Sequence, residues 1–134
     1  MKNQKLLLQK MSGVSLMLLL FLFFSNCAGG GGTFSTDVWN ITYDDQEGGI
    51  SLTYKSKNIC NGMYASYQWE GKEIKTSDYA RHKISTGKVS DSFGKGHIYK
   101  VEYTDKELPE LTQYFYLYPD KEYILTDFTV EAKE

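Results

Sequence analysis

The chain has 134 residues, of which 15 are basic and 17 are acidic, and its formal net charge is −2. Residues 1–27 contain three lysines and no acidic residue, so the rest of the chain has 12 basic and 17 acidic residues and a charge of −5. An acidic chain without a basic run argues against binding to nucleic acid or to anionic lipid through its surface. The length suits one domain with a single core.

The N-terminus predicts a secretory signal. Three lysines precede the apolar run Met11–Phe24, and Cys27 follows that run. A run of 14 residues is shorter than the about 20 that a membrane-spanning helix needs. A lone cysteine followed by small residues resembles the signal of bacterial lipoproteins. We therefore predict a signal-peptide helix in 1–27, lipidation of Cys27, and anchoring to a membrane of the bacterial cell envelope. The alternatives are an ordinary cleaved signal and an uncleaved anchor.

A glycine-rich stretch follows the signal. Residues 29–32 are all glycine, so we predict a flexible tether over 28–36 and a folded domain over 37–134. If Cys27 is acylated, Cys60 has no disulfide partner, because the chain contains two cysteines. The exported domain then depends on its core for stability.

The first half of the domain predicts short strands. Residues 38–43 and 50–54 alternate apolar and polar side chains around an acidic loop that ends in two glycines. A polar connection is expected over 55–62, and a third strand over 63–69. The residues expected to point inward in the first two strands are Trp39, Ile41, Tyr43, Ile50, Leu52 and Tyr54.

Weaker strands follow before the chain becomes strongly alternating again. Residues 73–75 and 79–84 are charged on one side, which is typical of edge or solvent-facing strands. Residues 97–103 then place Tyr99, Val101 and Tyr103 inward, with charged residues between them.

The stretch 111–130 predicts the central hairpin of the domain. Strand alternation puts two sets of residues on opposite faces, and both sets are largely apolar or aromatic. We therefore expect this hairpin at the centre of a sheet, with cover on both sides. One set is Leu111, Gln113, Phe115 and Leu117, and the other is Thr112, Tyr114, Tyr116 and Tyr118.

Seven or eight short strands without a convincing helix predict an all-β fold, an antiparallel β-sandwich. A closed barrel is the alternative. The C-terminal hairpin needs more cover than the apolar residues of the rest of the chain supply, which favours an incomplete domain.

No motif for catalysis or metal binding stands out. His82, His97 and Cys60 lack the short spacings of metal ligands. The Gly94-Lys95-Gly96 stretch precedes an expected strand, whereas a phosphate-binding loop precedes a helix, so it predicts a hairpin loop. We predict no metal site, no cofactor and no catalytic residue in this chain.

Tyrosines give the clearest indication of binding. Aromatic rings exposed on a sheet stack on the faces of sugars, with polar neighbours as hydrogen-bond partners. The alternative is that these aromatic residues fill the core of the sandwich and line its rims. The candidate glycan contacts are Tyr114, Tyr116 and Tyr118, and the candidate polar partners are Lys100, Gln113 and Asp127.

Three stretches carry a family resemblance: residues 93–101, 108–118 and 123–130. They resemble the N-terminal region of family-36 glycoside hydrolases, in the raffinose-synthase and α-galactosidase-like branch of Bacteroidetes. In that family an N-terminal β-supersandwich precedes a catalytic (β/α)₈ barrel. The resemblance implies that this domain is half of a supersandwich. The catalytic aspartates of the family belong to the barrel, so none is carried over.

Two functions follow as hypotheses. The first is a membrane-anchored lipoprotein that carries the non-catalytic N-terminal β domain of a carbohydrate-active protein, with carbohydrate or a separately encoded catalytic barrel as its partner. The second is a complete, small surface lipoprotein that binds a glycan or a protein.

Overall fold

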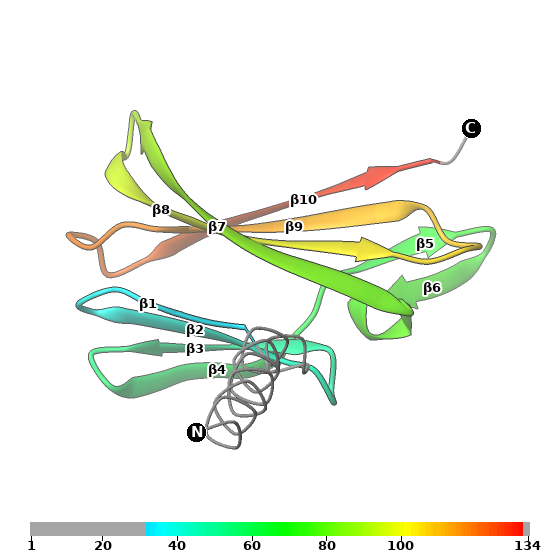
Figure 1. Cartoon of the computed structure of the whole chain (residues 1–134), viewed down its shortest axis with the longest axis horizontal. Coiled ribbons are helices and arrows are strands. Elements are labelled where there is room, and N and C mark those ends of the chain that lie inside the picture. The colour runs from blue at the N-terminus through cyan, green and yellow to red at the C-terminus, as the bar shows by residue number, and fades with distance from the viewer. Residues whose placement is uncertain (1–31, 133–134) are drawn as a thin grey trace, which may run out of the picture. The chain divides into compact units, whose positions relative to one another are not determined.

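The computed structural model describes residues 32–132, which belong to one compact unit. These residues form an antiparallel β-sandwich, as predicted, and within them a single 3₁₀ turn (Thr76–Asp78) is the only helical element. Figure 1 shows two four-stranded sheets facing each other, with a two-stranded ribbon at one end. No helix in the described part of the chain is long and apolar enough to cross a bilayer.

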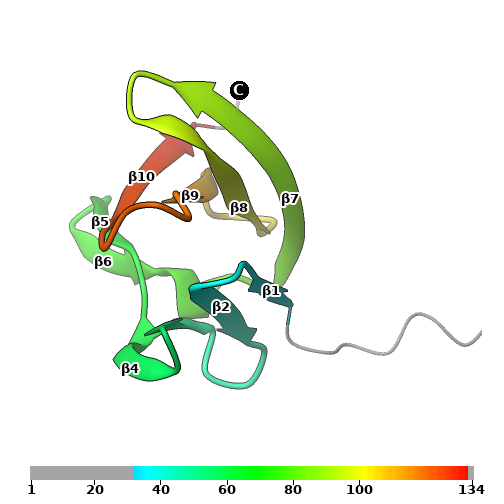
Figure 2. The same cartoon turned by 90° about the vertical axis from the view of Figure 1, so that its left-hand side faces the viewer.

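Each layer has a simple order of strands. The first sheet runs β1 (Thr33–Ser35), β2 (Trp39–Asp44), β3 (Gly49–Tyr54) and β4 (Lys57–Met63). The second sheet runs β10 (Ile124–Glu131), β9 (Glu110–Leu117), β8 (Gly94–Thr104) and β7 (Arg81–Asp91). The ribbon consists of β5 (Ser66–Trp69) and β6 (Lys72–Lys75). Figure 2 shows the long β7–β8 hairpin curving away from the first sheet.

The core lies between the two sheets. Strand alternation turns one apolar face of each sheet inward, and the side chains of both faces form one buried cluster. Every inward residue predicted for β2, β3 and β8 belongs to this cluster except Tyr54, which is partly buried and packs against it. The buried cluster is Trp39, Ile41, Tyr43, Ile50, Leu52, Tyr99, Val101, Tyr103, Leu111, Phe115 and Leu117.

The N-terminal boundary of the sandwich differs from the expected one. β1 lies inside the stretch predicted as a tether and pairs with β2 along its whole length. The carbonyl of Gly32 accepts hydrogen bonds from the Tyr43 amide (3.0 Å) and the Tyr99 hydroxyl (2.6 Å). The sandwich therefore includes residues 32–36. The predicted signal over 1–27, with Cys27, lies outside the described residues.

Three strands differ from expectation. The polar connection expected over 55–62 is wrong, because β4 occupies most of it and pairs with β3. The single strand expected over 63–69 is divided between β4 and β5. β7 continues to Asp91, well past the predicted end at residue 84, and pairs with β8 throughout.

The C-terminal hairpin is not wholly central. β9 lies between β8 and β10, but β10 pairs with β9 alone and forms the edge of the second sheet. Phe128 on β10 is accordingly 46% exposed.

Candidate glycan-binding face

β9 divides its side chains between the core and the outside. Leu111, Gln113, Phe115 and Leu117 are buried, whereas Thr112, Tyr114 and Tyr116 are only partly buried. Of the two faces of β9, one is therefore buried in the core and the other is partly exposed. We call this second side, with the neighbouring residues in register on β8 and β10, the outer face.

Two tyrosines form the centre of the outer face. Tyr114 and Tyr116 are two residues apart on one strand, so their rings lie side by side. Their ring centroids are 6.4 Å apart and the rings are inclined by 22°. The pair places two partly buried aromatic rings at the centre of the outer face.

The strands on either side supply different chemistry at the two ends of this pair. Residues that face each other across an antiparallel pair put their side chains on the same side of the sheet. Lys100 and Asp127 flank Tyr114, whereas Ile98 and Leu125 flank Tyr116. Lys100 also contacts the carboxylate of Glu102 (3.0 Å). The outer face is thus aromatic at its centre, charged at one end and apolar at the other.

The prediction that Tyr118 is a glycan contact beside Tyr114 and Tyr116 is wrong. Tyr118 lies just beyond the end of β9 and is fully buried. Its ring packs over Gly96, where a side chain would meet Tyr118 Cδ1 at 2.8 Å, and its hydroxyl donates to Asp91 Oδ2 (2.6 Å). Desolvation and this hydrogen bond raise the pKa of Tyr118 to about 12, and the same bond lowers the pKa of Asp91. Tyr118 therefore secures the β7–β8 hairpin.

Gln113 is also wrong as a polar partner for a sugar. Its side chain is buried on the opposite side of β9, and Tyr103 donates a hydrogen bond to Gln113 Oε1 (3.4 Å). Burial is the main cause that raises the pKa of Tyr103. A buried amide needs such a partner, so Gln113 has a structural role within the core.

The three residues considered as metal ligands have separate environments. His82 contacts Asp45 Oδ1 (2.9 Å) and the Tyr43 ring, His97 packs against the Phe34 ring, and Cys60 packs against the core. Among residues 32–132, no three histidine, cysteine or acidic side chains gather into a metal-binding group.

Sequence reasoning missed the apolar end of the outer face. Ile98 and Leu125 come from different strands, and only the registers of β8 and β10 against β9 bring both of them beside Tyr116. Alternation within each strand indicates which side of the sheet each residue is on, but it does not give the register between strands.

Comparisons with protein-family models, with curated proteins and with solved structures gave no match to this chain.

Proposed function

We propose that this chain is a non-catalytic module that binds glycans through the outer face of its second sheet. The observation that carries the proposal is the pair Tyr114 and Tyr116, held nearly parallel on the partly exposed face of β9. Sugar rings stack on such aromatic surfaces, and Lys100 and Asp127 are in place to bond sugar hydroxyl groups. With Cys27 as the lipid anchor, the module belongs to the bacterial cell envelope.

The ligand class comes from the family resemblance. The resemblance to the N-terminal domain of family-36 glycoside hydrolases favours α-galactosides, and the chain itself is assigned no catalytic residue. Hydrolysis of α-galactosides by the purified chain would contradict this assignment.

The test is a binding titration of the full-length chain with raffinose and with unrelated oligosaccharides. A polyoxyethylene detergent is needed, because a maltoside detergent would itself present sugar. Aromatic stacking contributes about 0.5–1.5 kcal/mol beyond buried area, so Tyr116→Ala is expected to weaken binding by about 2- to 12-fold. Tyr64→Ala is the matched control, because Tyr64 is a 51% exposed tyrosine outside the outer face. Equal affinities for both variants and the unmodified chain would refute the aromatic surface.

A second function is favoured by the apolar end of the outer face. Ile98, Tyr116 and Leu125 would be buried if a further β layer or a separately encoded catalytic barrel covered this side, as in a supersandwich. A photo-crosslinker at position 98 tests this idea in cells. Crosslinking to a (β/α)₈ glycosidase would support docking, whereas glycan binding without such a crosslink would support an autonomous module.

A further inference from the structure

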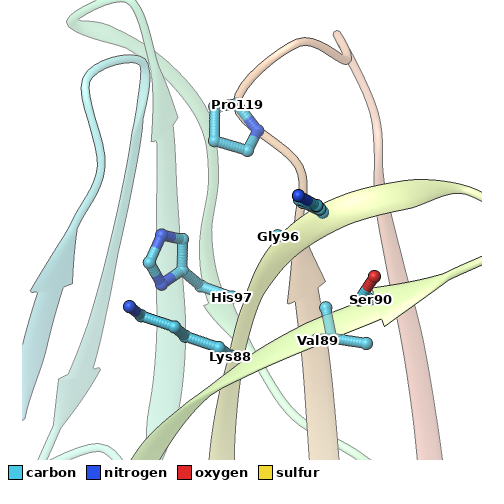
Figure 3. A pocket seen from close by; sticks show the side chains of 7 residues that line it. Lys88, Val89, Ser90, Gly96, His97 and Pro119 are labelled. Carbon is cyan, nitrogen blue, oxygen red and sulfur yellow. The ribbon is translucent and has the colours of Figure 1, made fainter.

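A second candidate site lies away from the outer face, on the β7–β8 hairpin. The hairpin and the turn after β9 enclose an open depression of about 480 Å³, which Figure 3 shows at close range. Three of its lining residues, Lys88, Lys95 and His97, carry nitrogen groups that can be cationic. No aspartate or glutamate is among the described residues that line it.

Strand register brings these nitrogen groups together. Lys88 is paired with His97, and Ser90 is paired with Lys95, so all four side chains start on one side of the hairpin. Figure 3 shows Lys88 and His97 extending to the same side. Lys88 and Lys95 lie diagonally across the strand pair from each other. Their positive charges are close enough to repel each other.

The described residues do not neutralise this charge by ion pairing. Within residues 32–132, neither Lys88 nor Lys95 has a carboxylate within 4.0 Å of its ammonium group. Asp91, at the end of the same hairpin, accepts hydrogen bonds from the Tyr118 hydroxyl and the Phe93 amide. Asp120, in the turn after β9, pairs with Lys121 (3.2 Å). Unpaired lysines on a domain whose overall charge is negative mark this depression as a distinct electrostatic region.

Two of the residues that line the depression, Gly96 and His97, are held in place by packing. Gly96 lies directly beneath the Tyr118 ring, and a Cβ at this position would lie 2.6 Å from the Leu117 carbonyl oxygen. The His97 ring is held against Phe34, with ring centroids 5.2 Å apart. A preformed site loses less conformational entropy when a ligand binds.

We propose that Lys88, Lys95 and His97 form a binding site for a tetrahedral oxyanion, the phosphate or sulfate group of a small molecule. Lysine ammonium groups bind phosphate as point charges, and an oxyanion between them would remove their mutual repulsion. The Ser90 hydroxyl offers a further donor. The volume exceeds that of the anion alone and suits a ligand of sugar-phosphate or sulfated-sugar size.

The test uses the ¹⁵N-labelled full-length chain in a polyoxyethylene detergent, titrated with inorganic phosphate and with sulfate. We expect saturable shifts of the backbone amides at residues 88, 95 and 97 below about 50 mM anion, because two charge-assisted contacts supply roughly the binding free energy of a millimolar dissociation constant. Sodium chloride at matched ionic strength should leave these amides unchanged, because screening alone does not fill the site.

Two matched variants separate a specific site from general surface charge. Lys88→Gln with Lys95→Gln should weaken binding at least about tenfold, because two charge-assisted contacts are lost. Lys57→Gln with Lys106→Gln removes the same charge from exposed positions elsewhere and should leave the affinity unchanged. Both pairs of lysines are exposed, so both variants should fold. No saturable shift, or equal affinities for the two variants, would overturn the proposal.

Free anions and lipid headgroups carry the same chemistry, and a further arm distinguishes them. Amide shifts are compared in nanodiscs of phosphatidylcholine with and without phosphatidylglycerol. Phosphate binding without a response to phosphatidylglycerol assigns the site to a soluble ligand. Responses to both, each lost in the Lys88/Lys95 variant, extend the site to headgroups. A response to phosphatidylglycerol without phosphate binding overturns it as a small-oxyanion site. Loss of glycan binding in the Tyr116 variant has no bearing on any of these outcomes.

Discussion

The close approach of Tyr118 to Gly96 makes a sharp prediction about stability. A Cβ at residue 96 would lie 2.6 Å from the Leu117 carbonyl oxygen and 2.8 Å from Tyr118 Cδ1. Both distances are shorter than real Cβ contacts, and the carbonyl belongs to backbone that cannot move freely. Overpacking of this kind costs about 1–3 kcal/mol. Gly96→Ala should therefore destabilise the sandwich.

A matched control isolates this cost. Gly87 lies on the same hairpin, and a Cβ there would meet nothing within 4 Å. Replacing a strand glycine by alanine gains about 0.5–1 kcal/mol through the unfolded chain. Gly87→Ala should show this gain alone, and Gly96→Ala should show it minus the clash. The two variants should therefore differ by about 2 kcal/mol in the free energy of unfolding.

Urea denaturation of residues 28–134, monitored by tryptophan fluorescence, measures the difference in free energy of unfolding between the two variants. For a domain of this size, 2 kcal/mol corresponds to a midpoint shift of about 1 M urea and about 8–16 °C in Tm. An equal or higher stability of Gly96→Ala relative to Gly87→Ala would refute the packing of Tyr118 over Gly96. A mutual shift of Tyr118 and the hairpin would then have to absorb the added methyl group.

Three further predictions concern the turn after β3 and the titrating groups. Ser56 has a φ of 62° in the two-residue turn between β3 and β4. Ser56→Gly should relieve this strain, increase the free energy of unfolding by about 0.5–1 kcal/mol and raise Tm by a few degrees. Desolvation raises the pKa of both Tyr99 and Tyr118 to about 12 from an ordinary 10.0, so the folded state favours the neutral phenols. The urea midpoint should therefore stay constant below pH 10 and fall between pH 10 and 12. A midpoint that stays constant between pH 10 and 12 would contradict this prediction. The pKa of Asp91 is lowered from 3.8, so the stabilisation from its carboxylate is present above pH 3.8 and is lost on further acidification. The unmodified chain should therefore have a higher Tm than Asp91→Asn at neutral pH, and the two Tm values should converge in acid. Identical Tm values at every pH would count against the Asp91–Tyr118 hydrogen bond.

Strand alternation predicted the core well. In β2, β3, β8 and β9, large apolar side chains recur at every second position, and these strands are buried on one face. The hydrophobic effect then determines which face turns inward, because a register slip of one residue would expose the whole set. The all-β class followed from the same pattern.

The polar strand β4 was missed because its own sequence lacks that pattern. Most of its residues are exposed, and it is held by pairing with β3 at the edge of the first sheet. The turn before it is built from Lys55 and Ser56, both with positive φ, although such turns usually contain Asn-Gly or Asp-Gly. Neither the strand nor its turn has a local signal.

The candidate binding face was predicted in part. Tyr114 and Tyr116 followed from alternation within β9, and so did the outward direction of Lys100. Tyr118 did not, because the strand ends at Leu117 and the absence of a side chain at Gly96 lets the ring lie down against the hairpin. The charge cluster of Lys88 and Lys95 likewise depends on a hairpin that extends beyond its predicted end.

The carbonyl of Gly32 has a mechanical consequence. It is bonded at once to Tyr43 in the first sheet and to Tyr99 in the second. Tension applied through the preceding residues would therefore reach both layers together, and β1 could not peel from its edge until this clamp had opened. If the chain is anchored through Cys27, as proposed, a pulling force would enter the sandwich at this clamp.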